Sequence, residues 1–188
     1  MNIGKMIKVI HLQPFIPHYR EEFFSLLGRR LKEKNVGQSF EQEIYTFEKT
    51  KDVKSASFNM SNISCKHIQS MLIKGKLLVY NPFKLLHKEN EVLVLMLHFA
   101  HISTWLLLLT KRLHHKKIIL WGQGISVRRY LKEEKKPDWK LKWMMALADG
   151  VWLYMEKEKE QWQTLFPQKP MVALNNTLTG VDEMVNYK

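Results

Sequence analysis

The 188-residue sequence has a single cysteine, Cys65, and no segment that resembles a secretory signal peptide. One cysteine excludes an internal disulfide and favours a reduced, intracellular setting. Internal repeats and low-complexity tracts are also absent, so a solenoid or linker architecture is not indicated. What remains is 45% hydrophobic and 11% aromatic content, which is enough to bury the core of one domain.

Several common functional motifs are missing as well. The first expected strand lacks the glycines of a dinucleotide-binding fingerprint, and the chain has no Gly-Lys-Ser/Thr loop. The residues around Ser126 lack the second glycine of a hydrolase nucleophile elbow. His98 and His101 are three residues apart, a weak metal signal without a nearby carboxylate or second cysteine. We therefore expect no metal and no cofactor, and pocket lining or ordinary packing stays open for both histidines.

The charge is strongly basic, at a formal net +12. Residues 111–142 hold eleven Lys and Arg against three Asp and Glu, which is two-thirds of that net charge. Such a concentration of positive charge attracts phosphorylated molecules, nucleic acid or an acidic membrane. The alternative is that these residues form a solvated surface without a ligand. No RNA-binding signature accompanies it, so we expect no nucleic-acid partner.

Alternation of apolar strand-like runs with helical periodicity predicts an α/β fold, a Rossmann-like parallel sheet of about seven strands with helices on both faces. Residues 77–80 are ambiguous. Asn81 and Asp138 are expected to cap helices. The strands are expected to begin near Met6, Glu43, Ser64, Val92, Lys117, Gly150 and Met171.

Residues 92–110 contain no charged side chain and are long enough to raise a transmembrane helix. Against that alternative, the run divides into a strand-like half and a half with two histidines, which would fall near the middle of a bilayer. We expect a central strand followed by a mostly buried helix.

Three loops follow predicted strands, at residues 13–20, 98–101 and 121–124. Because carboxyl ends of parallel strands share one edge, these loops are expected to meet there and bind a ligand. The alternative is that Tyr19 packs under the helix that follows and that Arg20 is solvated. The candidate binding residues are His18, Tyr19, Arg20, His98, His101 and Gln123.

Segments "PFIPHYREEFFSLL" (14–27), "KIILWGQG" (117–124), "ADGVWLYMEKEKEQW" (148–162) and "MVALNNTL" (171–178) together resemble bacterial family 4 glycosyltransferases over about residues 6–182. The resemblance implies half of a GT-B fold, with residues 1–182 as the N-terminal, acceptor-side domain and 183–188 as a tail or linker. A missing C-terminal domain would bind the sugar nucleotide, as substrate.

The implied function is binding of a surface-polysaccharide or lipid-linked acceptor for sugar transfer, with Gly122 and Gly124 near the donor phosphate. This chain alone is expected to be inactive. Many family members carry a histidine where this chain has Gln123, and an amide cannot titrate near neutral pH. The alternative is a free-standing Rossmann-like module that binds an anionic ligand or partner without catalysis.

The basic stretch also predicts a peripheral position on the anionic cytoplasmic face of the cell membrane. Trp143, Met144 and Leu147 are expected to form a shallow apolar edge there. The residues expected at the membrane surface are Arg128, Arg129, Lys132, Lys140, Lys142 and Trp143.

Overall fold

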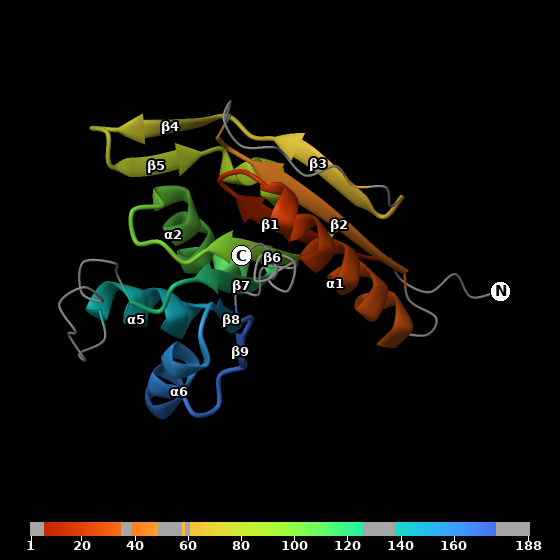
Figure 1. The fold of residues 1–188 in the computed structure, drawn as a ribbon. Coiled ribbons are helices and arrows are strands. Elements are labelled where there is room, and N and C mark those ends of the chain that lie inside the picture. The colour runs from red at the N-terminus through yellow and green to blue at the C-terminus, as the bar shows by residue number, and fades with distance from the viewer. Residues whose placement is uncertain (1–5, 35–38, 49–57, 59–60, 126–137, 176–188) are drawn as a thin grey trace, which may run out of the picture.

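The computed structural model describes residues 6–34, 39–48, 58, 61–125 and 138–175 (Figure 1). Seven strands form one sheet in the order β3-β2-β1-β6-β7-β8-β9, and every neighbouring pair is parallel. The predicted α/β fold and all seven strands are confirmed. Their bounds are β1 Met6–Gln13, β2 Ser39–Thr46, β3 Ile63–His67, β6 Asn90–Met96, β7 Lys117–Gly122, β8 Gly150–Leu153 and β9 Met171–Ala173.

A separate antiparallel hairpin joins β4 (Ser70–Ile73) to β5 (Leu77–Tyr80), which settles the ambiguous segment as a strand. Lys74 and Gly75 in its turn have φ angles of 52° and 64°. Positive φ at two successive residues suits the right-handed twist of a hairpin, and glycine adopts it without steric cost.

The helices occupy the connections between strands. Both predicted caps are confirmed: Asn81 Oδ1 accepts from Phe83 N–H at 3.0 Å, and Asp138 Oδ1 accepts from Lys140 N–H at 2.9 Å. The helical elements are η1 His18–Arg20, α1 Glu21–Lys34, η2 Pro82–Leu85, α2 Ile102–Leu109, α3 Lys111–His114, α5 Trp139–Leu147 and α6 Glu156–Leu165.

The uncharged run 92–110 is divided between β6 and the eight-residue α2, which confirms the expected strand followed by a helix. The helix is not mostly buried as expected, because Ile102, Leu106 and Leu109 on its outer side are exposed. In the part of the chain that the structure describes, no helix is long and apolar enough to cross a membrane.

Two hydrophobic cores lie on opposite faces of the sheet, because successive side chains of a strand point to opposite sides. Ile10 and Leu12 of β1 join the larger core, which α2, α5, α6 and the hairpin cover. Val9 points the other way, into a smaller core under α1 with Phe24 and Trp121.

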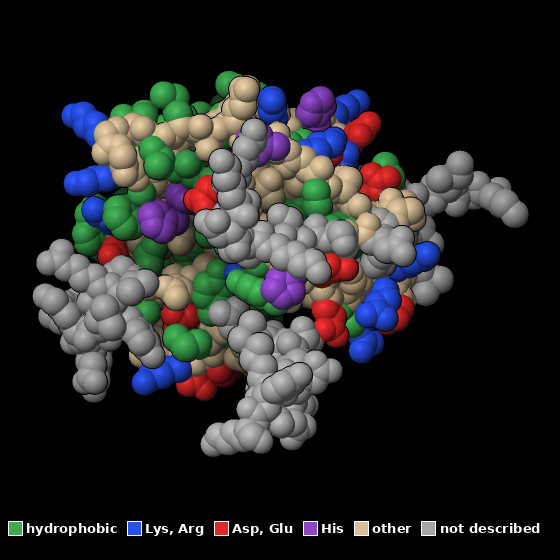
Figure 2. Space-filling model, turned by 45° about the horizontal axis from the view of Figure 1, so that its top comes forward, with side chains coloured by type: hydrophobic (Ala, Val, Ile, Leu, Met, Phe, Trp, Pro, Cys, Tyr) green, Lys and Arg blue, Asp and Glu red, His purple; other side chains and the backbone are tan. Residues whose placement is uncertain are grey.

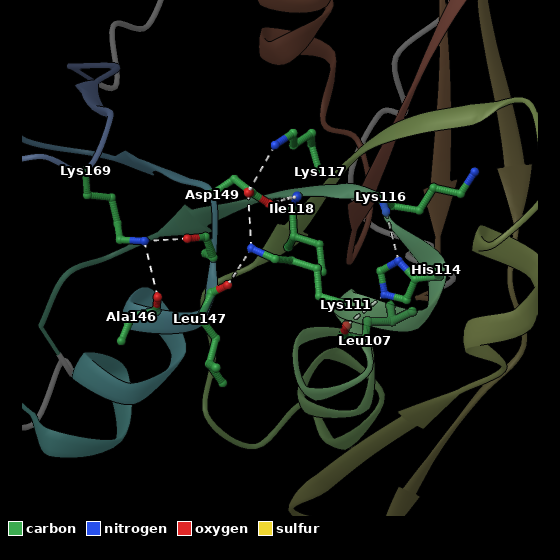
Figure 3. A network of polar contacts seen from close by, with 11 residues as sticks. Leu107, Lys111, His114, Lys116, Lys117, Ile118, Ala146, Leu147, Asp149 and Lys169 are labelled. Carbon is green, nitrogen blue, oxygen red and sulfur yellow. Dashed lines mark hydrogen bonds and ion pairs between the residues drawn. The ribbon is translucent and has the colours of Figure 1, made fainter.

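Asp149, just before β8, connects the amino ends of β7 and β8 (Figure 3). Its Oδ2 accepts from Ile118 N–H at 2.8 Å, and its Oδ1 lies 3.1 Å from Lys111 Nζ and 3.7 Å from Lys117 Nζ. Its own N–H donates to Ile118 O at 2.8 Å. The aspartate of the "ADG" segment therefore holds the sheet together at the edge opposite the predicted site.

Candidate ligand-binding site at the carboxyl edge of the sheet

Four adjacent strands deliver their last residues to one edge. β1, β6, β7 and β8 end at Gln13, Met96, Gly122 and Leu153, and the registers place Met96 beside Trp121 and Gly122 beside Leu153. The loops that follow them therefore start side by side, as the sequence predicted.

A pocket of about 330 Å³ lies at this edge. That volume is at the small end of the range for small-molecule sites. Its lining combines polar and apolar residues, the combination that fixes a ligand's orientation. The lining residues are Met96, Leu97, His98, Phe99, Gly122, Gln123, Ile125, Asp138, Leu141 and Tyr154.

His98 is an uncharged hydrogen-bonding group at neutral pH. Burial lowers the pKa of its imidazole below the ordinary value of 6.5. Nδ1 accepts from Ala100 N–H at 3.3 Å, so the neutral ring carries its proton on Nε2 and can donate from there. The ring stacks on Phe99, with centroids 5.4 Å apart and planes 10° from parallel.

His101 lies next to His98 but does not line the pocket. The two ring centroids are 5.0 Å apart, and His101 is only 8% exposed. Burial, followed by the neighbouring His98, lowers the pKa of His101 to about 4. The backbone N–H of His101 donates to His98 O at 3.1 Å, and Ala100 O accepts from Leu78 N–H at 2.9 Å. His101 therefore packs within a loop that β5 holds in place.

Arg20 crosses the same edge beside the pocket. Its Nη1 donates to Gln13 Oε1 at 2.7 Å, its Nη2 donates to Tyr154 Oη at 3.4 Å, and its guanidinium lies 4.8 Å from the ring centre of Trp121. The side chain thus links the ends of β1, β7 and β8 and positions Tyr154, which does line the pocket. The alternative considered for Tyr19 and Arg20 describes neither of them: Arg20 is half-buried and hydrogen-bonded, not simply solvated, and Tyr19 is 43% exposed, not packed under the helix.

His18 and Tyr19 are exposed, with ring centroids 6.0 Å apart, and neither lines the pocket. Of the six candidate binding residues, the structure brings together His98 and Gln123 in the pocket. Figure 2 shows histidine side chains beside hydrophobic ones on the face in view.

Both predicted phosphate-proximal glycines have packing reasons to be glycine. A Cβ on Gly122 would lie 3.0 Å from Leu97 Cβ, and a Cβ on Gly124 would lie 2.6 Å from Trp162 Nε1. Trp162 Nε1 also donates to Gly124 O at 2.7 Å. These contacts fix the backbone on both sides of Gln123, whose own side chain is exposed.

Sequence reasoning did not place Tyr154 and Asp138 in the site, and it included Phe99 only as part of the loop 98–101, not as a candidate binding residue. Tyr154 follows the end of β8 directly, so the strand-end argument applied to Gln123 could have found it. Asp138 was expected only as a helix cap, and no local pattern indicates that it also lines a pocket.

No protein-family model matches the chain, and no curated protein matches it. Among solved structures, it is similar to one described as a UDP-N-acetylglucosamine 2-epimerase from Listeria monocytogenes, at 11% identity and a TM-score of 0.49, over 88% of this chain and 43% of that chain. It is also similar to a UDP-GlcNAc 2-epimerase from Methanocaldococcus jannaschii, at 10% identity and a TM-score of 0.46, over 90% of this chain and 45% of that chain. A third similar structure is an alpha-glucosyltransferase in complex with UDP-glucose and DNA containing an abasic site, at 15% identity and a TM-score of 0.40, over 90% of this chain and 42% of that chain. The chain spans less than half the length of each, and similarity at this level assigns neither family nor activity.

Proposed function

We propose that this chain is the acceptor-binding domain of a GT-B-type glycosyltransferase, acting on a surface-polysaccharide or lipid-linked sugar acceptor. The observation that carries the proposal is the pocket at the carboxyl edge, which His98, Gln123 and Tyr154 line together with apolar residues. The sequence resemblance supports it, because the "KIILWGQG" segment forms β7 and the turn that carries Gln123.

The chemistry of the lining suits a sugar. Hydroxyl groups both donate and accept hydrogen bonds, and the amide of Gln123 can do both in return. Neutral His98 offers an N–H, and the carboxylate of Asp138 can accept from a hydroxyl. Phe99 adds an aromatic ring to the lining, and such a ring can pack against the C–H groups of a sugar. None of these contacts requires a charged ligand.

Gln123 binds and does not transfer protons, since an amide does not titrate near neutral pH. In the proposed complete enzyme, the departing nucleotide's phosphate charge is stabilised by a second domain. This division makes acceptor binding, and not turnover, the activity expected of the 188-residue chain. The enzyme is proposed to work in the cytoplasm.

The test is ligand-observed NMR of the folded chain with a panel of mono- and disaccharides, with inorganic phosphate as the anionic probe. We expect saturable sugar binding that Gln123→Ala and His98→Ala each weaken, by about 1 kcal/mol or more per lost hydrogen bond, about five- to tenfold. His87→Ala is the matched control, because His87 is exposed and lies outside the pocket.

Two results would contradict the proposal. Sugar binding that is unchanged in both pocket variants would place the site elsewhere, and a folded chain that binds no sugar would remove the acceptor role. Binding of phosphate without any sugar would favour the anionic-ligand module instead.

A further inference from the structure

Helix α2 is apolar on the side that faces away from the core as well as on the side that faces it. Four side chains at positions i, i+4, i+7 and i+11 form one stripe through α2 and α3. Their exposed fractions rise along the stripe: Ile102 41%, Leu106 44%, Leu109 67% and Leu113 81%. A soluble helix normally places polar residues on this side, so the stripe is informative.

Helix α5 continues the apolar surface. Leu141, Met144 and Met145 face the core, while Trp139 and Trp143, one turn apart, are 65% and 63% exposed. α5 packs against α2 on the same face of the sheet. The outward sides of the two helices therefore point in the same direction, away from that face.

The hairpin and η2 extend this surface on the other side of α2, since both pack against it. Figure 1 shows the hairpin, α2 and α5 following one another down the left of the molecule. Leu72 of β4 pairs with Leu78, whose side chain joins the core, so Leu72 lies on the core side of the hairpin and is 60% exposed at its border. Met71 and Ile73 point to the opposite side of the hairpin. Phe83 of η2 is 73% exposed. We define the apolar face as Leu72 and Phe83 together with the four stripe residues and the two tryptophans.

The apolar face is large for a monomer. The two indoles alone, at about 250 Å² each and roughly two-thirds exposed, leave on the order of 300 Å² in solvent. The six other side chains add to this, and patches beyond a few hundred Å² mark interaction sites.

The charges on the segments that carry the apolar face are predominantly basic. Segments 70–88, 102–117 and 139–148 together contain ten Lys and Arg and no Asp or Glu, and two of the ten, Lys111 and Lys117, form ion pairs with the adjacent Asp149. A second copy of this chain docked face to face would bring these like charges together, which opposes a dimer. An anionic lipid surface supplies both an apolar interior and the opposite charge.

We propose that the apolar face inserts into the headgroup region of an anionic bilayer, with α2 lying in the membrane plane. The eight residues of α2 span about 12 Å, too short to cross. Trp139 and Trp143 take the interfacial position that tryptophan prefers, and Arg112 and Lys142 reach lipid phosphates. The proposal is independent of what the pocket binds.

The residues of the proposed membrane contact differ in part from those predicted from the sequence. Trp143 and Lys142 lie exposed on α5, but Met144 is fully buried, so its assignment to a lipid-facing edge was wrong. Lys140 is half-buried with Nζ 4.7 Å from the ring centre of Phe99. Arg128, Arg129 and Lys132 lie outside the described residues.

The test is vesicle flotation of the 188-residue chain with phosphatidylcholine alone and with an equal mixture of phosphatidylcholine and phosphatidylglycerol. We expect binding to the mixture only, strongly reduced at about 1 M salt, where the Debye length falls to about 3 Å. Leu109→Ser combined with Leu113→Ser should weaken the partition coefficient at least about tenfold. Arg112→Glu should weaken it too.

Matched controls come from α1, on the opposite face of the sheet. Leu26 is 45% exposed and Arg29 is exposed, so Leu26→Ser and Arg29→Glu should leave partitioning unchanged. Circular dichroism confirms that each variant is folded. In addition, brominated lipid should quench tryptophan fluorescence in the wild type, and less in the Trp143→Phe variant.

Three results of the vesicle experiments would overturn the proposal. These are absence of binding to the anionic vesicles, equal loss of binding in the α1 controls, and equal binding to both vesicle types. A concentration-dependent dimer in sedimentation that the Leu109→Ser/Leu113→Ser variant abolishes would show that a second copy covers the face, and would overturn it as well.

Discussion

Replacing Asp149 by alanine tests the connection at the amino ends of β7 and β8. The carboxylate accepts from Ile118 N–H at 2.8 Å and from Lys111 Nζ at 3.1 Å, and its side chain is 26% exposed. Hydrogen bonds to charged groups contribute about 1.5–3 kcal/mol, and leaving a buried N–H without a partner costs about 1–3 kcal/mol. We therefore expect Asp149→Ala to lower the free energy of unfolding by about 3 kcal/mol, or Tm by roughly 6–12 °C.

The pH dependence supplies a sharper check. Burial alone would raise the pKa of Asp149, but the Ile118 N–H and the Lys111 and Lys117 ammonium groups outweigh it and hold the pKa below its ordinary value. A depressed carboxyl pKa stabilises the fold above the unfolded pKa of about 3.9, and that stability is lost as pH falls through the folded pKa. The stability gap between wild type and Asp149→Asn should stay constant from about pH 7 to 5 and shrink only below about pH 4.

Urea unfolding followed by circular dichroism measures both effects. Glu33→Ala is the control, because Glu33 forms an ion pair with Arg30 in which the side chains are 60% and 67% exposed, and such pairs contribute about 0–1 kcal/mol. A loss at Asp149 no larger than at Glu33, or a gap that already shrinks between about pH 7 and 5, would refute the assignment of Asp149 as a charged anchor.

Two further predictions concern the cores. His11 is fully buried, and burial lowers its pKa to about 3, although Gln42 opposes the shift. The neutral His11 ring contributes its full stability above about pH 6.5, and this stability is lost as pH falls. Urea unfolding should therefore show that His11→Leu loses about 2 kcal/mol less stability than the wild type between pH 7 and 5. An equal loss in both proteins would show that His11 is not the group responsible. Gly124→Ala should destabilise by about 1–3 kcal/mol, because the new Cβ meets Trp162, and an unchanged Tm would contradict that contact.

Much of the fold could be predicted because parallel strands are buried on both faces and appear as short apolar runs. Residues 92–97 and 117–121 are such runs, and β6 and β7 lie there. The hairpin strand β4 was not predicted. Its residues Met71 and Leu72 are hydrophobic but exposed, so the hydrophobicity of this segment does not indicate a buried strand. The Lys74-Gly75 turn between two apolar segments was the available signal.

The site could be predicted to the level of loops and not of side chains. Parallel pairing places the turns after β6 and β7 together, which brings His98 and Gln123 to one pocket. It does not determine the direction of a side chain within a loop. Arg20 is drawn toward Gln13 by a 2.7 Å hydrogen bond, whereas the adjacent Tyr19 is left exposed. Asp138 arrives from a distant segment, so its position depends on how α5 packs.

The pocket and the apolar face adjoin at Phe99. This residue lines the pocket and is 39% exposed, and Lys140 Nζ lies 4.7 Å from its ring centre and 5.6 Å from that of Trp139. If the face rests on a bilayer, the pocket opens close to the lipid headgroups, and a lipid-linked acceptor would be held at high effective concentration.

The same sugar should then bind more tightly as a lipid conjugate in anionic vesicles than free in solution. Leu109→Ser/Leu113→Ser should remove that difference while leaving binding of the free sugar unchanged, whereas Gln123→Ala should weaken both. A preference for the conjugate that survives loss of membrane binding would show that the lipid is recognised by the pocket itself.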